Sequence, residues 1–329
     1  MMKNSLFTLL ILCFCFSARG QQINGIVTDR ETALPIDYAS VFFDGTFVGT
    51  TTDMNGGFDL DVTKYKARPL TISAVGYHPV SITAFSPGET IQIKLIPRVF
   101  ELEEVVVRSK SLVRKRRACM RIINNEFIGL TSNARKCYIL NEEDITFNYG
   151  SDQDTLKAYA SKPIHIRNLS LGYDISYHLG RFEYDRRTQT TLYTGSIIFN
   201  RDLAEDEESL QRYERRRAYA FTGSSKHFFR ALWANSLESE GFVLTNYRTE
   251  QNLQYEHIVS ENFQGRKFLV YNQDIKIDYY SNLSYISFRE FQVYFEADGY
   301  FEPLPIIWTG KMSEQRIADF LPFEYLSPD

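Results

Sequence analysis

Residues 41–62, VFFDGTFVGTTTDMNGGFDLDV, decide the fold of the first part of the chain. Their centre combines acid, amide and glycine residues in the manner of a calcium loop. An EF-hand loop that began at Asp53 would need an oxygen ligand at its fifth position, glycine at its sixth and glutamate at its twelfth. The chain has Gly57, Phe58 and Lys64 at those three positions. We therefore expect no metal site here.

The same letters are typical of a tight turn between two strands. TFVGTTTD before the turn and GFDLDV after it alternate apolar and polar residues, as half-buried strands do. Asp53 and Asn55 can bond the local backbone through their side chains, and Gly56 and Gly57 permit a positive φ. These four residues are therefore expected to be the structural turn of a β-hairpin.

Short bursts of alternating apolar and polar residues continue on both sides of this turn. About seven such strands fall within residues 23–96 with no helical period between them, which indicates an antiparallel β-sandwich. We place this domain at residues 21–97. The strand-like segments are INGIVTD, YASVFFD, TFVGTTTD, GGFDLDV, PLTISAVGY and TIQIKLI.

The order and spacing of these segments resemble the carboxypeptidase-like regulatory domain (CarboxypepD_reg-like), a transthyretin-like β-sandwich. The matching stretches are INGIVTD, LPIDYASVFFDG, GTTTDMNGGFDLDV, LTISAVGYHPVSI and IQIKLIP, which together span roughly residues 22–97. The resemblance implies a non-catalytic module of the kind common in exported proteins of Bacteroidetes-type bacteria. In those bacteria it often leads outer-membrane receptors and other envelope proteins.

The sequence lacks the catalytic part of a zinc carboxypeptidase. Such an enzyme needs a histidine followed three residues later by glutamate, and none of the 5 histidines has an acidic residue at that position. No histidine is followed directly by glutamate either, which removes the metalloprotease helix motif. Phosphate-binding glycine loops, dinucleotide fingerprints and paired-cysteine metal motifs are also missing from the sequence. We expect no cofactor and no metal.

The first residues, MMKNSLFTLLILCFCFSARGQQ, are typical of a secretory signal peptide, which we assign to residues 1–20. Lys3 precedes an apolar run over residues 6–16, and small residues flank a cleavage point near Gly20. The run is too short to cross a bilayer as a helix. We therefore predict an exported protein, periplasmic or outer-membrane associated, whose contact with a membrane is at most peripheral.

The composition indicates a globular, β-rich protein that does not bind nucleic acid. Apolar residues make up 43% of the chain and charged residues 24%, and the aromatic share of 15% favours strands. A formal net charge of -4 provides no basic footprint for nucleic acid. Cys119 and Cys137 lie outside the signal peptide, and in an exported protein they form either a disulfide or two free buried thiols.

Residues 98–118 are expected to link the sandwich to a second domain. Their segment LEEVVV resembles the start of the region that follows such sandwiches in TonB-dependent outer-membrane receptors. Glu103, Val105, Val106 and Val107 would there add as a strand to a TonB-like partner by β-augmentation. The alternative is an ordinary strand that belongs to the sandwich or docks the two domains.

A basic cluster at residues 114–117, RKRR, closes this linker. Met120, Ile123 and Phe127 follow it at helical spacing, so we expect an amphipathic helix. The cluster is then either a contact for anionic lipid head groups or the solvated start of that helix. The second interpretation is the more ordinary outcome for basic residues at a helix end.

Residues 119–329 are predicted to form a β-rich α+β domain. Phe291, Val293 and Phe295 share one face of a strand whose other face is polar, which favours a sheet in water over a membrane barrel. Asp298-Gly299 is a two-residue hairpin signal. The strand-like segments are 190–199, 267–280, 283–288 and 291–302.

Two helices are expected among these strands. Residues 202–217 place acids at their start and arginines at their end, which suits the helix dipole, and Glu208 and Arg212 form an i,i+4 pair. Residues 225–240 have apolar residues along one side, and Gly241 is expected to end this helix. We expect the acids of the first helix to be solvated and not to bind a metal.

The segment 215–242 holds the candidate site residues of the second domain. Ser224, His227 and Arg230 are its candidate catalytic residues, although no Gly-x-Ser-x-Gly elbow is present. A serine and a histidine this close at a helix start seldom face one another, so a helix cap and a surface histidine are the alternative. The candidate binding residues are Tyr219, Phe228 and Trp233.

These observations predict an exported, non-catalytic protein of the cell envelope. Its second domain resembles the C-terminal region of uncharacterised carboxypeptidase-regulatory-like proteins, a resemblance that implies no activity. We expect this domain to bind a protein, peptide or glycan partner. The alternatives are an envelope hydrolase with an undescribed site in the second domain and a docking protein of a TonB system.

Overall fold

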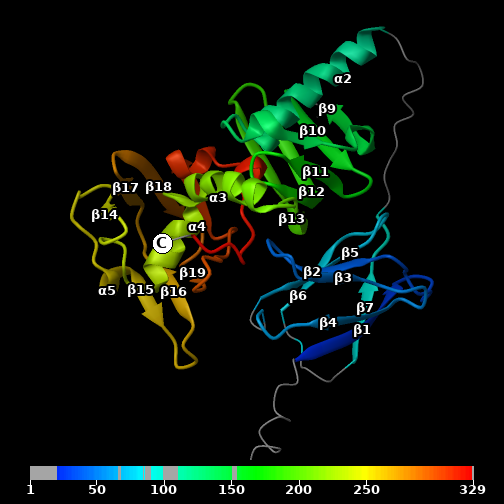
Figure 1. Cartoon of the computed structure of the whole chain (residues 1–329), viewed down its shortest axis with the longest axis horizontal. Helices are drawn as coiled ribbons and strands as arrows, with labels where there is room; N and C mark the ends of the chain where they lie inside the picture. Colours follow the sequence, from blue (N-terminus) through cyan, green and yellow to red (C-terminus); the bar gives the residue numbers. More distant parts are fainter. Residues whose placement is uncertain are drawn as a thin grey trace, which may run out of the picture. The chain divides into compact units, whose positions relative to one another are not determined.

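The computed structural model of the chain describes residues 21–65, 68–83, 85, 90–98, 110–149 and 154–327. The chain divides into two compact units, Met1–Glu104 and Val105–Asp329 (Figure 1). Each unit has its own hydrophobic core. The predicted signal peptide, residues 1–20, and the predicted docking residues Glu103, Val105, Val106 and Val107 lie outside the described residues.

The first unit is a sandwich of two small sheets, with strand orders β4-β1-β7 and β3-β2-β5-β6. The predicted sandwich is confirmed, with one difference in direction. β1 and β7 pair in parallel, whereas the other described pairs of this unit are antiparallel. The strands are β1 (Gln22–Asp29), β2 (Ser40–Phe43), β3 (Gly49–Thr51), β4 (Gly57–Asp61), β5 (Leu70–Ser73), β6 (Val80–Ile82) and β7 (Thr90–Leu95).

The core of the sandwich follows from the alternation that the sequence shows. Along β1 the side chains of Ile23 and Val27 point inward. Asn24 and Ile26, on either side of Gly25, are more exposed. A Cβ atom on Gly25 would lie 2.5 Å from the ring of Phe58 on β4, so only glycine fits beneath that ring. Burial of Phe58 in the core therefore depends on the glycine of INGIVTD.

The turn at residues 53–57 joins the two sheets and is not the tip of a hairpin, so the hairpin prediction is wrong. β3 before it pairs with β2, and β4 after it pairs with β1. The Asp53 carboxylate accepts hydrogen bonds from the backbone N–H groups of Asn55 and Gly57, both at 2.8 Å. Gly56 has a φ of 74°, and its carbonyl accepts a bond of 2.8 Å from the N–H of Val27.

The second unit begins with a helix and a long twisted sheet (Figure 1). The central strand β12 pairs along its length with β13, and on its other side with β11 and then β10. β8 and β9 pair with β11 and β10 at the outer edge. The elements are α2 (Lys110–Ile123), β8 (Cys137–Ile139), β9 (Ile145–Tyr149), β10 (Thr155–Ala160), β11 (Ile164–Asn168), β12 (Tyr173–Asp185) and β13 (Thr190–Asp202).

The predicted amphipathic helix is α2, continued by a π-helical turn at Asn124–Ile128. Met120, Ile123 and Phe127 are all buried, as predicted. The ring of Phe127 meets the rings of Tyr177 and Tyr193 edge to face, with centroids 4.8 and 5.4 Å apart. These contacts hold the helix against the sheet of β12 and β13.

α2 begins inside the predicted linker, so residues 110–118 belong to the second unit. Within the basic cluster, Arg116 has a structural role. Its guanidinium donates to the carbonyl oxygen of Ile145 at 2.9 Å and to that of Glu142. Arg114, Lys115 and Arg117 are exposed on the helix, which fits both a solvated helix start and a contact with lipid head groups.

The two later helices differ from the prediction at their ends. α3 (Glu207–Phe221) starts at the cap Asp206 because β13 extends to Asp202. α4 (Ser225–Trp233) ends well before Gly241. Asn235 has a φ of 53°, and the N–H of Ser236 donates to the carbonyl of Ala231 at 2.9 Å. This is a Schellman ending, in which asparagine takes the position that glycine usually holds.

α4 lies between two further antiparallel sheets and forms the centre of the second core. Phe228, Phe229 and Leu232 of this helix are fully buried. One sheet has the order β14-β17-β18-β20 and the other β15-β16-β19. Their strands are β14 (Phe242–Asn246), β15 (Val259–Glu261), β16 (Lys267–Val270), β17 (Ile275–Tyr279), β18 (Asn282–Phe288), β19 (Gln292–Phe295) and β20 (Ile306–Gly310), with α5 (Tyr255–Ile258) before β15.

Two strand predictions in this region need correction. Residues 267–280 are two strands, β16 and β17, in different sheets, because the chain leaves the first sheet at residues 271–274. Phe291 precedes β19 and is 72% exposed, whereas Val293 and Phe295 are buried as expected. Asp298-Gly299 does form a tight turn, since Gly299 has a φ of 86° and donates its N–H to the carbonyl of Glu296.

The residues after β20 connect the two halves of the second unit. Arg316 donates to the carbonyl of Glu126 at 3.0 Å, and Asn168 donates to the carbonyl of Ala318 at 2.9 Å. The carboxylate of Asp319 accepts from Thr131 and Asn133, at 2.8 and 2.9 Å. Among the described residues, no helix is long and apolar enough to cross a membrane.

Candidate functional site

Ser224 and His227 lie close together but do not face one another. The Ser224 hydroxyl oxygen accepts the backbone N–H of His227 at 3.0 Å, which caps α4. His227 uses Nδ1 to accept the N–H of Gly223 at 3.0 Å, and its Nε2 lies 3.1 Å from a carboxylate oxygen of Glu240. Burial lowers the pKa of His227, so the imidazole is neutral, with its proton on Nε2. Both ring nitrogens are engaged, and neither can activate the serine.

Arg230 is also engaged in holding the fold. Its Nε donates to the carbonyl of Asp298 at 2.8 Å, and its Nη2 donates to the carbonyls of Phe323 and Tyr325 at 3.1 and 2.6 Å. Burial lowers the pKa of this guanidinium. Ser224 therefore caps a helix, His227 packs at the edge of the core, and Arg230 holds the C-terminal segment in place.

The candidate binding residues have different surroundings. Phe228 is fully buried against Phe229 and Phe242, so the structure excludes it as a contact residue in the folded protein. Trp233 is half-buried, and the ammonium of Lys267 lies 4.8 Å from the centre of its ring. Tyr219 is 78% exposed on α3 and remains a candidate.

Cys119 and Cys137 are both buried and no disulfide joins them in the described part of the chain, so the disulfide alternative is not realised in this structure. Burial raises the pKa of the Cys137 thiol to about 12, which keeps it protonated and unreactive. Within the part of the chain that the structure describes, no three His, Cys, Asp or Glu side chains are grouped so that they could hold a metal ion.

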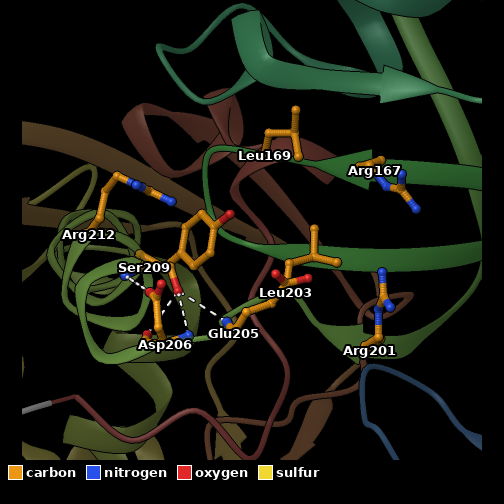
Figure 2. Close-up of a pocket in the computed structure, with 9 residues that line it drawn as sticks. Arg167, Leu169, Arg201, Leu203, Glu205, Asp206, Ser209 and Arg212 are labelled. Atoms are coloured by element: carbon orange, nitrogen blue, oxygen red, sulfur yellow. Dashed lines mark hydrogen bonds between the residues drawn. The ribbon is translucent and has the colours of Figure 1, made fainter.

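An open hollow in the second unit gathers arginine side chains that the sequence leaves far apart (Figure 2). Its volume is about 380 Å³. Arg167 comes from β11, Arg201 from β13 and Arg212 from α3. The side chains that line it are Arg167, Leu169, Arg201, Leu203, Glu205, Asp206, Ser209, Arg212 and Tyr213.

Asp174 on β12 orients two of these arginines. Arg167 binds the carboxylate through Nε and Nη2, at 2.8 and 3.0 Å, and Arg201 reaches it from the other side at 3.3 Å. The hydrogen bond from Arg167 is the main reason why the pKa of Asp174 lies below its usual value. Because one carboxylate is shared between two guanidinium groups, the pair keeps a positive charge and unused N–H donors.

Two leucines and a tyrosine supply the apolar part of the lining, which is otherwise polar. Leu169 and Leu203 lie between the arginines in Figure 2. The ring of Tyr213 packs against Gly172, where a Cβ atom would lie 2.5 Å from it. The N–H of Leu203 donates to the carbonyl of Gly172 at 2.8 Å, so the glycine fixes both the ring and the loop.

Arg212 has a different role from the one the sequence predicted. No ion pair joins it to Glu208 in the described chain, and its guanidinium lies 5.2 Å from the centre of the Tyr213 ring. Asp206 at the same rim is occupied, since it accepts the N–H of Ser209 at 2.7 Å as a helix cap. Arg212 is thus exposed beside the hollow, with its donors available for a ligand.

The guanidinium groups, with Leu169 and Leu203 between them, suit a ligand that carries a carboxylate or phosphate next to an apolar part, and the carboxylates of Glu205 and Asp206 line the same hollow. The sequence interpretation missed this site because its residues come from three elements. The only local signal was the recurrence of arginine at strand ends and on α3, which by itself is typical of a solvated surface. Pairing of β11, β12 and β13 brings Arg167, Asp174 and Arg201 into one row.

Comparisons with known proteins bear mainly on the first unit. Residues 23–107 match the family model of the CarboxypepD_reg-like domain. No curated protein matches the chain. Among solved structures, a protein of unknown function from Bacteroides fragilis, described as membrane-associated, aligns over 88% of this chain and 94% of its own at 12% identity, with a TM-score of 0.18.

A 9R-lipoxygenase from Cyanothece aligns over 65% of this chain and 48% of its own, also at 12% identity and a TM-score of 0.18. Likenesses this weak carry no argument about fold or function.

Proposed function

We propose, from the premise that residues 23–107 form a CarboxypepD_reg-like domain, that this chain is a non-catalytic binding protein of the cell envelope. In this proposal the sandwich is an accessory module and the second unit holds the ligand. The ligand is a peptide or glycan of the envelope with an anionic group, and the arginine hollow receives that group. The signal-like N-terminus supports export.

The convergence of Arg167, Arg201 and Arg212 on one hollow supports this proposal. Two of the guanidinium groups are held in place by Asp174, so a ligand would meet donors that are already oriented. Preorganised donors cost less conformational entropy on binding than free surface arginines do. Leu169 and Leu203 between them would add selectivity for a ligand that is more than a simple ion.

The hydrolase alternative is less well supported. Ser224, His227 and Arg230 are occupied by hydrogen bonds to their own backbone surroundings, and a nucleophile needs a base directed at it. Docking to a TonB-like partner through Glu103, Val105, Val106 and Val107 stays a prediction, because these residues lie outside the described part of the chain.

The test is capture of envelope components by the immobilised full chain at two salt concentrations. We expect retention of acidic glycan or peptide that decreases with salt, and a loss of at least about tenfold in the double variant Arg201→Ala/Arg212→Ala, because charge-assisted bonds to arginine are lost. Arg289→Ala is the matched control, since this arginine is exposed elsewhere. Equal retention by the double variant and the control would contradict the proposal.

A further inference from the structure

The hairpin between β17 and β18 has an unusual two-residue turn. Tyr280 and Ser281 form it with φ values of 46° and 70°, both in the left-handed region. A two-residue turn of this type is favourable for the strands, but it normally uses Asn-Gly, because other residues are strained there. The N–H of Ser281 donates to the Asp278 carboxylate at 2.7 Å, which helps to hold the turn.

The turn places the ring of Tyr280 against a glycine that leaves room for it. Tyr280 is 73% exposed, yet the edge of its ring touches Gly241, where a Cβ atom would lie 2.5 Å away. The neighbouring ring of Tyr279 lies equally close to Gly223, at 2.7 Å from a Cβ position. The two rings meet edge to face with centroids 4.9 Å apart. Two glycines thus make room for one pair of tyrosine rings.

A carboxylate without a cationic partner lies beside these rings. The Glu240 side chain is 50% exposed, and its carboxylate accepts a hydrogen bond from Nε2–H of His227. His227 is neutral because Nδ1 accepts the N–H of Gly223 and because burial lowers its pKa. In the described residues no lysine or arginine pairs with Glu240. Burial raises the pKa of Tyr279, with smaller contributions from Tyr280 and from the negative charge of Glu240.

We propose that Tyr279, Tyr280 and Glu240 form a second binding site, which takes the cationic side chain of a lysine or arginine on a partner protein. The cation would lie over the tyrosine rings and pair with the Glu240 carboxylate. His227 positions that carboxylate from the buried side. The charge favours a cation over a neutral sugar, because a lone carboxylate beside aromatic rings complements a positive group.

The strain in the turn supports a role in binding. Asn-Gly at these two positions would form the same turn more easily, but it would remove the exposed ring. Backbone strain that persists against an easier choice is concentrated at functional sites. The site is separate from the arginine hollow, which is lined by other residues.

The experiment measures binding of a labelled tetra-arginine peptide to the full chain by fluorescence anisotropy at low salt. The matching tetra-citrulline peptide serves as the uncharged probe. The variants are Glu240→Gln, which keeps a hydrogen-bond acceptor for His227, and the double variant Tyr280→Asn/Ser281→Gly. Glu256→Gln makes the same charge change at an exposed position elsewhere, and Arg201→Ala/Arg212→Ala alters only the hollow.

We expect the arginine peptide to bind at least tenfold more tightly than the citrulline peptide. Glu240→Gln and the turn variant should each weaken it about fivefold or more, whereas Glu256→Gln and the hollow variant should not. The turn variant should also melt at a higher temperature, by about 2–8 °C, which would show that weaker peptide binding comes from the lost tyrosine ring and not from unfolding.

Three outcomes would overturn the proposal. They are equal binding of the two peptides, an equal effect of Glu240→Gln and Glu256→Gln, and unchanged binding by the turn variant. Retention of a neutral oligosaccharide that is lost in the turn variant, without any response to the arginine peptide, would assign the site to a glycan instead.

Discussion

Two turns of this chain differ in how well their residue types suit their backbone conformation. The turn at residues 53–57 uses aspartate as an acceptor and Gly56 where φ is positive, as turn chemistry requires. The turn at Tyr280–Ser281 has two positive φ values and no glycine or asparagine at all. The first turn is fully explained by the fold. The second has an exposed tyrosine that the fold alone does not require.

This contrast indicates where function is to be sought in a protein of this kind. Natural sequences agree with their structures at most positions, and exceptions are concentrated at functional or strained sites. The Asp53 turn resembles a ligand cluster in sequence and is a structural element. The Tyr280 turn has an ordinary sequence and unusual geometry. Residue type alone would therefore suggest the Asp53 turn, and not the Tyr280 turn, as the functional site.

The largest expected effect is at Gly56. In Gly56→Ala the new Cβ atom would meet the Val27 carbonyl at 2.4 Å with φ at 74°, so both strain and a clash oppose folding. We expect a loss of about 3 kcal/mol in the free energy of unfolding by urea. Gly76→Ala is the matched control, since its φ is 83° and nothing lies within 4 Å, and it should lose only about 1 kcal/mol. Equal losses would show that the contact with β1 is unimportant.

The second effect has the opposite sign. Replacing Tyr280-Ser281 by Asn-Gly should increase the free energy of unfolding by about 1–2 kcal/mol, because the left-handed conformation costs these residues less. Urea unfolding followed by the fluorescence of the second unit would measure this change. A loss of stability would mean that the packing of Tyr280 on Gly241 outweighs the strain in the turn.

A smaller effect is expected at Asp53. Asp53→Ala removes the acceptor for the N–H groups of Asn55 and Gly57, which remain open to water, so we expect a loss of about 1 kcal/mol. Asp53→Asn keeps a side-chain oxygen and should recover most of it. Because the turn is structural, addition of calcium should not change the melting temperature of the wild type or of either variant.

The smallest effect concerns pH, and two carboxylates, Asp29 and Asp319, should contribute to stability in opposite directions. Backbone hydrogen bonds, that from Thr32 first, lower the pKa of Asp29, so its contribution to stability is present above pH 3.8 and is lost as the pH falls. Burial raises the pKa of Asp319, so its carboxylate reduces stability as the pH rises above 3.8. Urea midpoints should be measured from pH 3 to 7. The decrease in stability at low pH should be smaller in Asp29→Asn, and the decrease in stability as the pH rises above 3.8 should be smaller in Asp319→Asn. A wild-type slope in either variant would contradict the assignment.

Much of the first unit could be predicted because strand alternation and turn residues are local properties. Six of the seven strands fall on the predicted strand-like segments, β6 being the exception, and Asp53 bonds the local backbone as predicted. The hairpin prediction was wrong because local letters specify a turn but not which strands it joins. Pairing of β3 with β2 and of β4 with β1 is a long-range choice, made by the core on both sides.

The second unit was less predictable for the same reason. The predicted end of α4 was wrong because a residue other than glycine ends this helix. The predicted start of α3 was wrong because β13 continues beyond its apolar residues to Asp202. Phe228 was a candidate contact residue, but only the placement of α4 between two sheets shows that it is buried. The arginine hollow was not predicted at all, because strand pairing assembles it from residues with no common motif.

The sequence by itself determined the class of the first unit, the absence of recognised catalytic motifs and the amphipathic face of α2, since these depend on residue type and spacing along the chain. Only the tertiary structure decided which polar side chains are occupied and which are exposed. Ser224, His227 and Arg230 are used by their own surroundings, whereas Arg201, Arg212 and Tyr280 face outward. The physical reason is that hydrogen-bond partners and backbone strain are set by neighbours brought together from distant parts of the chain.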